Sequence, residues 1–227
     1  MIPRPANPIA IALDLSDLDR AEELASMLAP HVGLLKVGLE LAWAHGPEAV
    51  RRIARYGPVF VDAKLHDIPT TVERAATNIA RLGPAAFNVH ALGGEAMMAA
   101  AVQGAERGAL EAGVERPLVL AVTVLSSNAG EDLASPASLA YEAKVSGLDG
   151  VVVSGDDVRE VREACGEEFC LVVPGIRPTG SNGDDQVRIL TPAAAQEKGA
   201  DYLVLGRPVT GAEDPAAVVR GILLELR

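Results

Sequence analysis

The sequence has few aromatic residues and little positive charge. Phe, Trp and Tyr make up 3% of its 227 residues, and its formal net charge is −11 at pH 7. Nucleic-acid-binding proteins generally need basic surfaces and aromatic platforms on which bases stack. The composition therefore argues against nucleic acid as a partner, and an anionic ligand would have to be bound by cations gathered at one site.

Cysteine is also scarce. Cys165 and Cys170 lie five residues apart with no second pair, so the chain has neither a zinc-binding cluster nor a disulfide framework. We expect both thiols to be packed in the interior of a protein that works in a reducing compartment.

Long hydrophobic runs are missing as well. No apolar run approaches the roughly 20 residues that a membrane-spanning helix requires. The first residues, Met1 to Pro5, lack the charged region and the following apolar region of a signal peptide. The sequence thus predicts no association with a membrane and a cytoplasmic location.

Short runs of Val, Ile, Leu and Ala, in contrast, recur roughly every 25 residues. Amphipathic stretches with helix-capping residues separate them, from Asp17–Leu28 near the start to Pro215–Leu226 at the end. Because the runs are apolar on both faces, they are typical of parallel strands buried beneath helices. The predicted strands are Ile9–Leu13, Leu34–Val37, Val59–Leu65, Ala86–His90, Leu118–Leu125, Gly150–Ser154, Cys170–Pro174 and Tyr202–Gly206.

This repeating pattern favours an α/β fold, a closed (β/α)₈ TIM barrel that forms a single domain over residues 1–227. An open, doubly wound sheet is the alternative. No Gly-x-Gly-x-x-Gly turn follows the first predicted strand, which argues for the barrel.

Charged residues gather where the first three predicted strands end, at Asp14, at Lys36 and in the run from Asp62 to Asp67. In barrels of this kind the chemistry takes place at the carboxyl ends of the strands. Residues two apart on a strand share a face, so we expect Asp62 and Lys64 to lie side by side. An ion-pair network that only stabilises the rim of the barrel is the alternative.

Lysine is scarce in this sequence, and Asp67 has two possible roles. Only four lysines occur among 20 basic residues, and two of them, Lys36 and Lys64, lie at these strand ends. A lysine in a chain that otherwise uses arginine indicates a compact cation that can give up a proton. Asp67 has a second possible role, because Asp67-Ile68-Pro69 also fits a helix N-cap followed by a proline in the first turn.

Glycine and arginine follow the last two predicted strands, in Gly175-Ile176-Arg177 and in Gly206-Arg207. The loops after strands seven and eight of such barrels frequently hold a phosphate, because glycine lets backbone amides approach and arginine supplies paired donors. These turns predict a ligand that carries a phosphate. The stretch from Gly175 to Thr191 is long for a loop of a compact domain and is a candidate lid.

Four segments resemble the orotidine 5'-phosphate decarboxylase family. Residues 60–72, Phe-Val-Asp-Ala-Lys-Leu-His-Asp-Ile-Pro-Thr-Thr-Val, are similar to its Asp-x-Lys-x-x-Asp-Ile-Pro-x-Thr signature. Residues 121–127 resemble its strand-five motif, and residues 174–178 and 199–208 resemble its two phosphate-side motifs. The resemblance implies a homodimer without metal or cofactor that converts orotidine 5'-phosphate to uridine 5'-phosphate (UMP), the last step of de novo pyrimidine nucleotide synthesis.

The resemblance also implies a role for each site residue. Lys36, Asp62, Lys64 and an Asp67 donated by the partner chain would form an alternating charge array beneath the orotate ring. The substrate-binding residues would be Asp14 and Thr71 (the latter from the partner) at the ribose, Ser126 at the pyrimidine, Gln186 between base and phosphate, and Arg177, Gly206 and Arg207 at the phosphate.

The implied reaction sets the role of Lys64. Loss of carbon dioxide from C6 leaves an electron pair on a carbon that no carbonyl group delocalises, so the site must stabilise that charge electrostatically. Flanked by two carboxylates, Lys64 is expected to stay protonated, to stabilise the carbanion and to deliver its proton to C6.

Two alternatives remain at this point. A magnesium-dependent phosphosugar decarboxylase or aldolase on the same barrel shares Asp-x-Lys-x-x-Asp, but the Ile68-Pro69-Thr70-Thr71 continuation favours the nucleotide enzyme. A catalytically silent barrel that binds nucleotides is the second alternative, and the presence of every charged member of the array argues against it.

Overall fold

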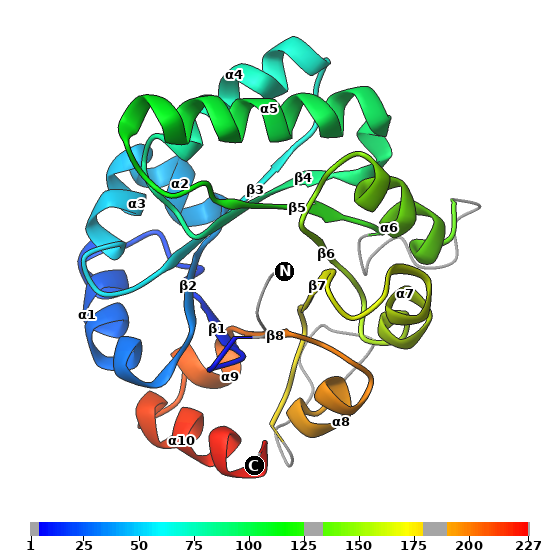
Figure 1. Ribbon diagram of the computed structural model, residues 1–227. Helices are drawn as coiled ribbons and strands as arrows, with labels where there is room; N and C mark the ends of the chain where they lie inside the picture. Colours follow the sequence, from blue (N-terminus) through cyan, green and yellow to red (C-terminus); the bar gives the residue numbers. More distant parts are fainter. Residues whose placement is uncertain (1–4, 125–133, 179–189, 227) are drawn as a thin grey trace.

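The computed structural model describes residues 5–124, 134–178 and 190–226 (Figure 1). Its eight strands are parallel and form a closed barrel in chain order, in which β8 pairs with β1. The predicted (β/α)₈ barrel is therefore confirmed, and the open sheet is excluded. The strands are β1 Ile9–Ala12, β2 Leu34–Val37, β3 Val59–Leu65, β4 Ala86–His90, β5 Leu118–Val122, β6 Gly150–Val152, β7 Cys170–Val173 and β8 Tyr202–Leu205.

Helices surround the barrel on the outside (Figure 1). The first begins at Leu18, since Asp17 is its N-cap and accepts hydrogen bonds from the backbone of Asp19 and Arg20. The α-helices are α1 Leu18–Leu28, α2 Leu39–His45, α3 Pro47–Ile53, α4 Pro69–Ala80, α5 Gly94–Ala112, α6 Pro136–Val145, α7 Val158–Cys165, α8 Pro192–Glu197, α9 Arg207–Thr210 and α10 Pro215–Glu225, with short 3₁₀ turns at Ala29–His31 and Ala91–Gly93.

The predicted bounds of β2, β3 and β4 are correct, whereas the other five strands end earlier than predicted. Leu13, Thr123 and Val153 each still donate one backbone hydrogen bond to the neighbouring strand, but the regular ladder has stopped. The apolar side chains of Leu13 and Val153 continue the hydrophobic pattern while the backbone leaves the sheet. Hydrophobicity alone therefore places these strand ends too far along the chain. The predicted end of the fifth strand, Leu125, lies outside the described residues.

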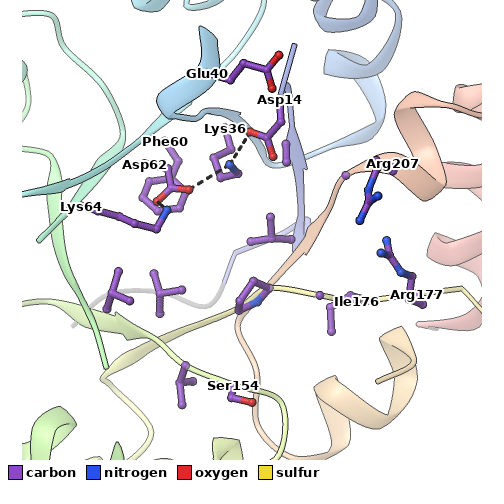
Figure 2. A pocket seen from close by; sticks show the side chains of 18 of the residues that line it. Asp14, Lys36, Glu40, Phe60, Asp62, Lys64, Ser154, Ile176, Arg177 and Arg207 are labelled. Atoms are coloured by element: carbon purple, nitrogen blue, oxygen red, sulfur yellow. Dashed lines mark hydrogen bonds and ion pairs between the residues drawn. The ribbon is translucent and has the colours of Figure 1, made fainter. Parts of the chain in front are cut away.

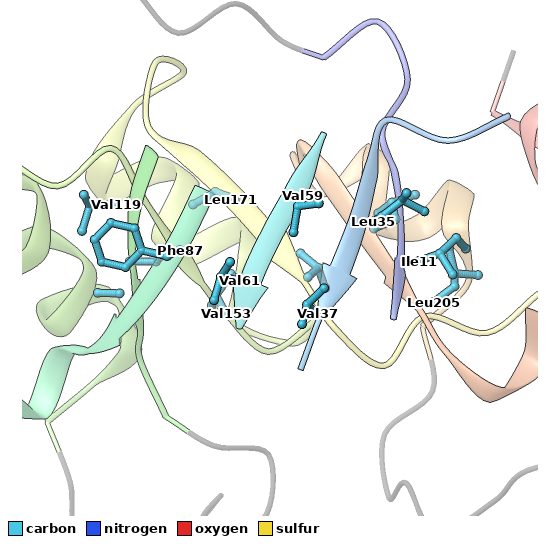
Figure 3. Close-up of a cluster of buried hydrophobic side chains, with 14 of the residues drawn as sticks. Ile11, Leu35, Val37, Val59, Val61, Phe87, Val119, Val153, Leu171 and Leu205 are labelled. Atoms are coloured by element: carbon cyan, nitrogen blue, oxygen red, sulfur yellow. The ribbon is translucent and has the colours of Figure 1, made fainter. Parts of the chain in front are cut away.

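The alternation of side chains along the strands divides the core into two layers. The inner layer fills the barrel with side chains from alanine to phenylalanine. The outer layer lies between the strands and the helices (Figure 3). Inner residues are Ala10, Ala12, Leu34, Phe60, Ala86, Leu120, Cys170, Val172 and Val204, and outer ones include Ile11, Leu35, Val37, Val59, Val61, Phe87, Val119, Leu171 and Leu205.

Polar side chains replace apolar ones towards the carboxyl ends of the inner face. Lys36 follows Leu34 on β2, Asp62 follows Phe60 on β3 and Asn88 follows Ala86 on β4, each two residues further on. Cys165 and Cys170 are both buried and free, as predicted. Among the described helices, none combines the length and the apolar character needed to cross a bilayer.

Candidate active site

A continuous chain of four charges lies across the first three strands. Lys36 Nζ donates to Asp14 Oδ1 at 2.9 Å and to Asp62 Oδ2 at 3.1 Å, and Lys64 Nζ donates to Asp62 Oδ1 at 2.6 Å. Figure 2 shows Lys36 between the two aspartates. Negative and positive side chains alternate in this row of four charges, so each cation has a carboxylate neighbour.

Burial and charge together determine the ionisation of the central pair. Burial alone would raise the pKa of Asp62, but Lys36, Lys64 and the hydrogen bonds from Lys64 and Asn88 lower it to about 2. Burial alone would lower the pKa of Lys36. The carboxylates of Asp62 and Asp14 have the larger, opposite effect, so the pKa of Lys36 is raised. Both groups are therefore charged at neutral pH.

The Asp62 and Lys64 side chains meet as predicted, but a regular strand is not the reason. Lys64 has a φ of 49°, the only positive value outside glycine in the described part of the chain. The pairing of β3 with β4 is regular up to Val61 and Phe87 and resumes at Leu65 and Val89, so four residues of β3 advance against two of β4. A bulge in β3 thus presents Lys64 to the site.

Asn88 is a site residue that the sequence analysis missed. It is fully buried; its Oδ1 accepts the backbone N–H of Lys64 at 2.7 Å, and its Nδ2 donates to Asp62 Oδ1 at 2.7 Å. The sequence did contain an indication of this role. Asn88 is an amide inside the otherwise apolar run Ala86 to Val89, and a polar group buried there needs a hydrogen-bond partner.

Gly38 was missed too. A Cβ at this buried position would lie 2.4 Å from Asp14 Oδ1 and 3.0 Å from Lys36 Nζ. The space that a side chain would take is therefore occupied by the first ion pair of the charge chain. Glu40, also not predicted, lines the same cavity and accepts a hydrogen bond from Ser16 at 2.7 Å.

The charge chain forms one side of a cavity of about 560 Å³ at the carboxyl ends of the strands. Arg177 and Arg207 extend into another part of the same cavity, from the segments after β7 and β8 (Figure 2). Arg177 is buried, with an exposed fraction of 5%. Of the residues predicted for the site, the cavity brings together Asp14, Lys36, Asp62, Lys64, Arg177, Gly206 and Arg207.

Asp67 and Thr71 do not line this cavity; both are exposed, beyond the end of β3. The N-cap interpretation of Asp67 is wrong, because the N-cap of α4 is Ile68 and the hydrogen bond that the Asp67 carboxylate accepts within the described residues comes from the neighbouring Ile68 N–H. Pro69 does occupy the first turn of α4 as predicted. Its fixed φ suits that position, and its missing N–H costs nothing there.

Two other predicted contacts, Ser126 and Gln186, lie outside the described residues, as does most of the candidate lid.

The arrangement suits an anion with two negative groups and an apolar surface between them. Lysines lie at one side of the cavity and arginines at another, and Phe60, Val122, Val152 and Val204 supply apolar surface between them. Within residues 5–124, 134–178 and 190–226, no three His, Cys, Asp or Glu side chains are grouped as metal ligands would be. A guanidinium pair binds phosphate oxygens well, because its planar fork matches them.

Comparison with known proteins gives a consistent result. A family model described as "Orotidine 5'-phosphate decarboxylase / HUMPS family" matches residues 7–222. Proteins named orotidine 5'-phosphate decarboxylase from Moorella thermoacetica and Anaeromyxobacter dehalogenans are 46% and 49% identical, each over 230 residues that cover 96% of this chain and 91% and 98% of the relative. The crystal structure of orotidine 5'-phosphate decarboxylase from Lactobacillus acidophilus is similar with a TM-score of 0.83 and 36% identity, covering 97% of this chain and 99% of that one.

Proposed function

Because the chain belongs to the orotidine 5'-phosphate decarboxylase / HUMPS family, we propose that its cavity converts orotidine 5'-phosphate to UMP and carbon dioxide. The family description covers two groups, and the relatives at 46% and 49% identity carry the decarboxylase name. The observation that carries the proposal is the alternating chain of Asp14, Lys36, Asp62 and Lys64 in one cavity with Arg177 and Arg207.

In the proposed reaction the bond between C6 and the carboxylate breaks, carbon dioxide leaves, and the electron pair stays on C6. Lys64 stabilises that pair as an ammonium ion and then transfers its proton to C6. The bulge in β3 supports this role, since it directs the Lys64 ammonium into the cavity beside Asp62. Asp62 holds the ammonium in place and lies near the departing carboxylate.

Substrate binding is proposed to use the remaining predicted residues. Arg177 and Arg207 bind the phosphate together with the backbone at Gly206, and Asp14 binds the ribose. Ser126 contacts the pyrimidine, and Gln186 joins base and phosphate when the segment after Gly175 closes over the ligand. The burial of the Arg177 guanidinium beside the cavity supports the phosphate assignment, because a buried cation favours an anionic partner.

We further propose a homodimer in which each chain donates Asp67 and Thr71 to the other's cavity. In its own chain Asp67 makes no ion pair with a described cation, and the neighbouring Ile68 side chain is 66% exposed. A partner chain that covers this surface would bury the Ile68 side chain and could bring a cation to Asp67. The cytoplasm is the proposed location, in agreement with two free cysteines.

The test is a spectrophotometric assay of orotidine 5'-phosphate consumption, with and without excess chelator. We expect the same rate in both, and no turnover by a Lys64→Ala variant that still binds UMP, since Lys64 acts mainly in the transition state. Loss of activity on chelation would instead favour the magnesium-dependent phosphosugar enzymes. Near-normal turnover by Lys64→Ala would refute the assignment of the proton donor.

A further inference from the structure

The side-chain amide of Asn88 connects the backbone of Lys64 with the carboxylate that holds the Lys64 ammonium. Its oxygen accepts the Lys64 N–H at 2.7 Å, and its nitrogen donates to Asp62 Oδ1 at 2.7 Å, the atom that Lys64 Nζ contacts at 2.6 Å. Asn88 is fully buried and does not line the cavity. It therefore acts on the site only through its two neighbours on β3.

Lys64 needs such support because of its backbone. A left-handed φ of 49° is unfavourable for a residue with a Cβ and persists only where the surroundings stabilise it. The bulge also takes Lys64 out of register with β4, so its N–H bonds to a side chain rather than to a strand carbonyl. The amide oxygen of Asn88 thus replaces the missing ladder hydrogen bond.

We propose that Asn88 is a positioning residue for the reaction: it holds the strained Lys64 backbone and the Asp62 carboxylate in one fixed arrangement. The inference rests on the proposed role of Lys64 as proton donor. Asn88 touches neither the cavity nor the reacting atoms, so it is not a catalytic residue. It determines where the Lys64 ammonium lies.

An amide is the group that these two contacts require. One atom must accept a hydrogen bond from an N–H and the other must donate to a carboxylate, so an ionised Asp would place like charges together and an apolar side chain would leave the Lys64 N–H without a partner. The partner of Asn88 on β5 is Leu120, which offers no polar group as a replacement.

The first experiment compares Asn88→Ala with Asn7→Ala. Asn7 also makes two hydrogen bonds, to His31 O and from Ile9 N–H, but at the opposite end of the barrel. We expect kcat of Asn88→Ala to fall about 100-fold with KM little changed, because a misplaced proton donor slows the chemical step. The Asn7→Ala variant should keep kcat even if its melting temperature falls. A normal kcat for Asn88→Ala would overturn the proposal.

The second experiment uses Asn88→Asp, which is nearly the same shape and remains informative if the alanine variant is unstable. A protonated carboxyl can do what the amide does, since one oxygen accepts and the O–H donates. Burial and the negative charge of Asp62 raise the pKa of the introduced carboxyl, while Lys64, Lys36 and a protonated His90 oppose that shift.

We therefore expect kcat of Asn88→Asp, divided by kcat of the unmodified protein, to rise as the pH falls. A ratio that does not change with pH would overturn the proposal. If Lys64→Ala is inactive in the same assays while both Asn88 variants behave normally, the positioning role fails and the proposed function stands. If Lys64→Ala is active, it is the proposed function that fails.

Discussion

At the scale of single residues, two uncharged residues, Asn88 and Gly38, give the charged side chains their positions. Asn88 holds Asp62 and Lys64 through hydrogen bonds, whereas Gly38 acts by having no side chain. Gly38 has a φ of −89°, so its backbone conformation is open to any residue. What it provides is space for the Asp14 and Lys36 ion pair.

Gly38→Ala should therefore reduce activity more than stability. The new methyl group would displace Asp14 and Lys36, and we expect kcat/KM to fall about 10- to 100-fold, the usual cost of misplaced site groups. The free energy of unfolding should change by less than about 1 kcal/mol, because only side-chain ends must move.

Steady-state kinetics and urea denaturation measure the two effects of Gly38→Ala. The control is Gly57→Ala, where an added Cβ would make ordinary contacts at 3.8 Å with Ala29 and Leu35. Unchanged kcat/KM in Gly38→Ala would mean that Asp14 and Lys36 tolerate displacement.

At the scale of elements, two aspartates connect the amino ends of neighbouring strands through hydrogen bonds. These ends lie on the side of the barrel opposite to the cavity. Asp201, just before β8, accepts the Leu171 N–H of β7 at 2.8 Å and pairs with Arg162 of α7 at 2.6 Å. Asp149, just before β6, accepts the Val119 N–H of β5 at 2.7 Å and pairs with Arg116. Each carboxylate thus connects two strands and an arginine.

The two pairs differ in burial, so their removal should cost different amounts. Side chains of Arg162 and Asp201 are each 7% exposed, compared with 30% and 16% for Arg116 and Asp149. We expect Asp201→Ala to cost about 3–5 kcal/mol, because it leaves a buried guanidinium without its carboxylate.

The matched variant Asp149→Ala should cost less, about 1–3 kcal/mol. Chemical denaturation measures both values, and kcat per folded molecule should stay normal in each variant. An equal loss in the two variants would contradict the argument from burial.

At the scale of the whole molecule, charge is distributed unevenly. The chain carries a net charge of −11, whereas in the cavity the four cations Lys36, Lys64, Arg177 and Arg207 outnumber the three carboxylates of Asp14, Glu40 and Asp62. An anionic substrate is thus attracted at one place on a chain whose overall charge opposes it. The same uneven burial of charge makes stability depend on pH.

Stability should decrease on acidification in two steps. Burial, His66 and Lys64 lower the pKa of His90 below its ordinary 6.5. The folded protein therefore favours the neutral imidazole, and the stability that this form gives is complete above pH 6.5 and is lost as the pH falls below that value. Asp62 has its pKa lowered from 3.8 to about 2, so its contribution is lost between about pH 4 and pH 2.

Thermal unfolding from about pH 8 to about pH 2 tests this dependence. His90→Asn should remove the upper step and leave the lower one. An upper step that persists in His90→Asn would assign it to another group.

The proposed dimer gives a prediction that only a shared site can produce. Lys64→Ala and Asp67→Ala should each be nearly inactive alone, since each homodimer breaks both of its sites. A mixed dimer has one intact site, with Lys64 from one chain and Asp67 from the other. Random exchange makes about half the dimers mixed, so roughly a quarter of all sites should regain activity.

The measurement is the activity of the two variants refolded together, compared with each refolded separately. Subunit exchange is verified with differently tagged chains. If exchange occurs without any gain in activity, Asp67 serves its own chain.

The sequence by itself determined the barrel and the order of charges along the chain. Strand runs that are apolar on both faces, spaced by amphipathic stretches, specify βα units, and residues two apart on a strand share a face. This local periodicity was sufficient to bring Asp14, Lys36 and Asp62 to one end of the barrel, whereas Lys64 reaches them through the bulge in β3.

Tertiary structure alone decided how those charges are held. The left-handed Lys64 backbone, the amide of Asn88 that lies 24 residues further along the chain, and the Asp14 carboxylate against Gly38 all depend on the register between neighbouring strands. Asp67 faces outward because the chain turns into α4 directly after it. The bulge and the contacts of Asn88 and Gly38 result from packing between segments distant in sequence, which no local pattern of residues encodes.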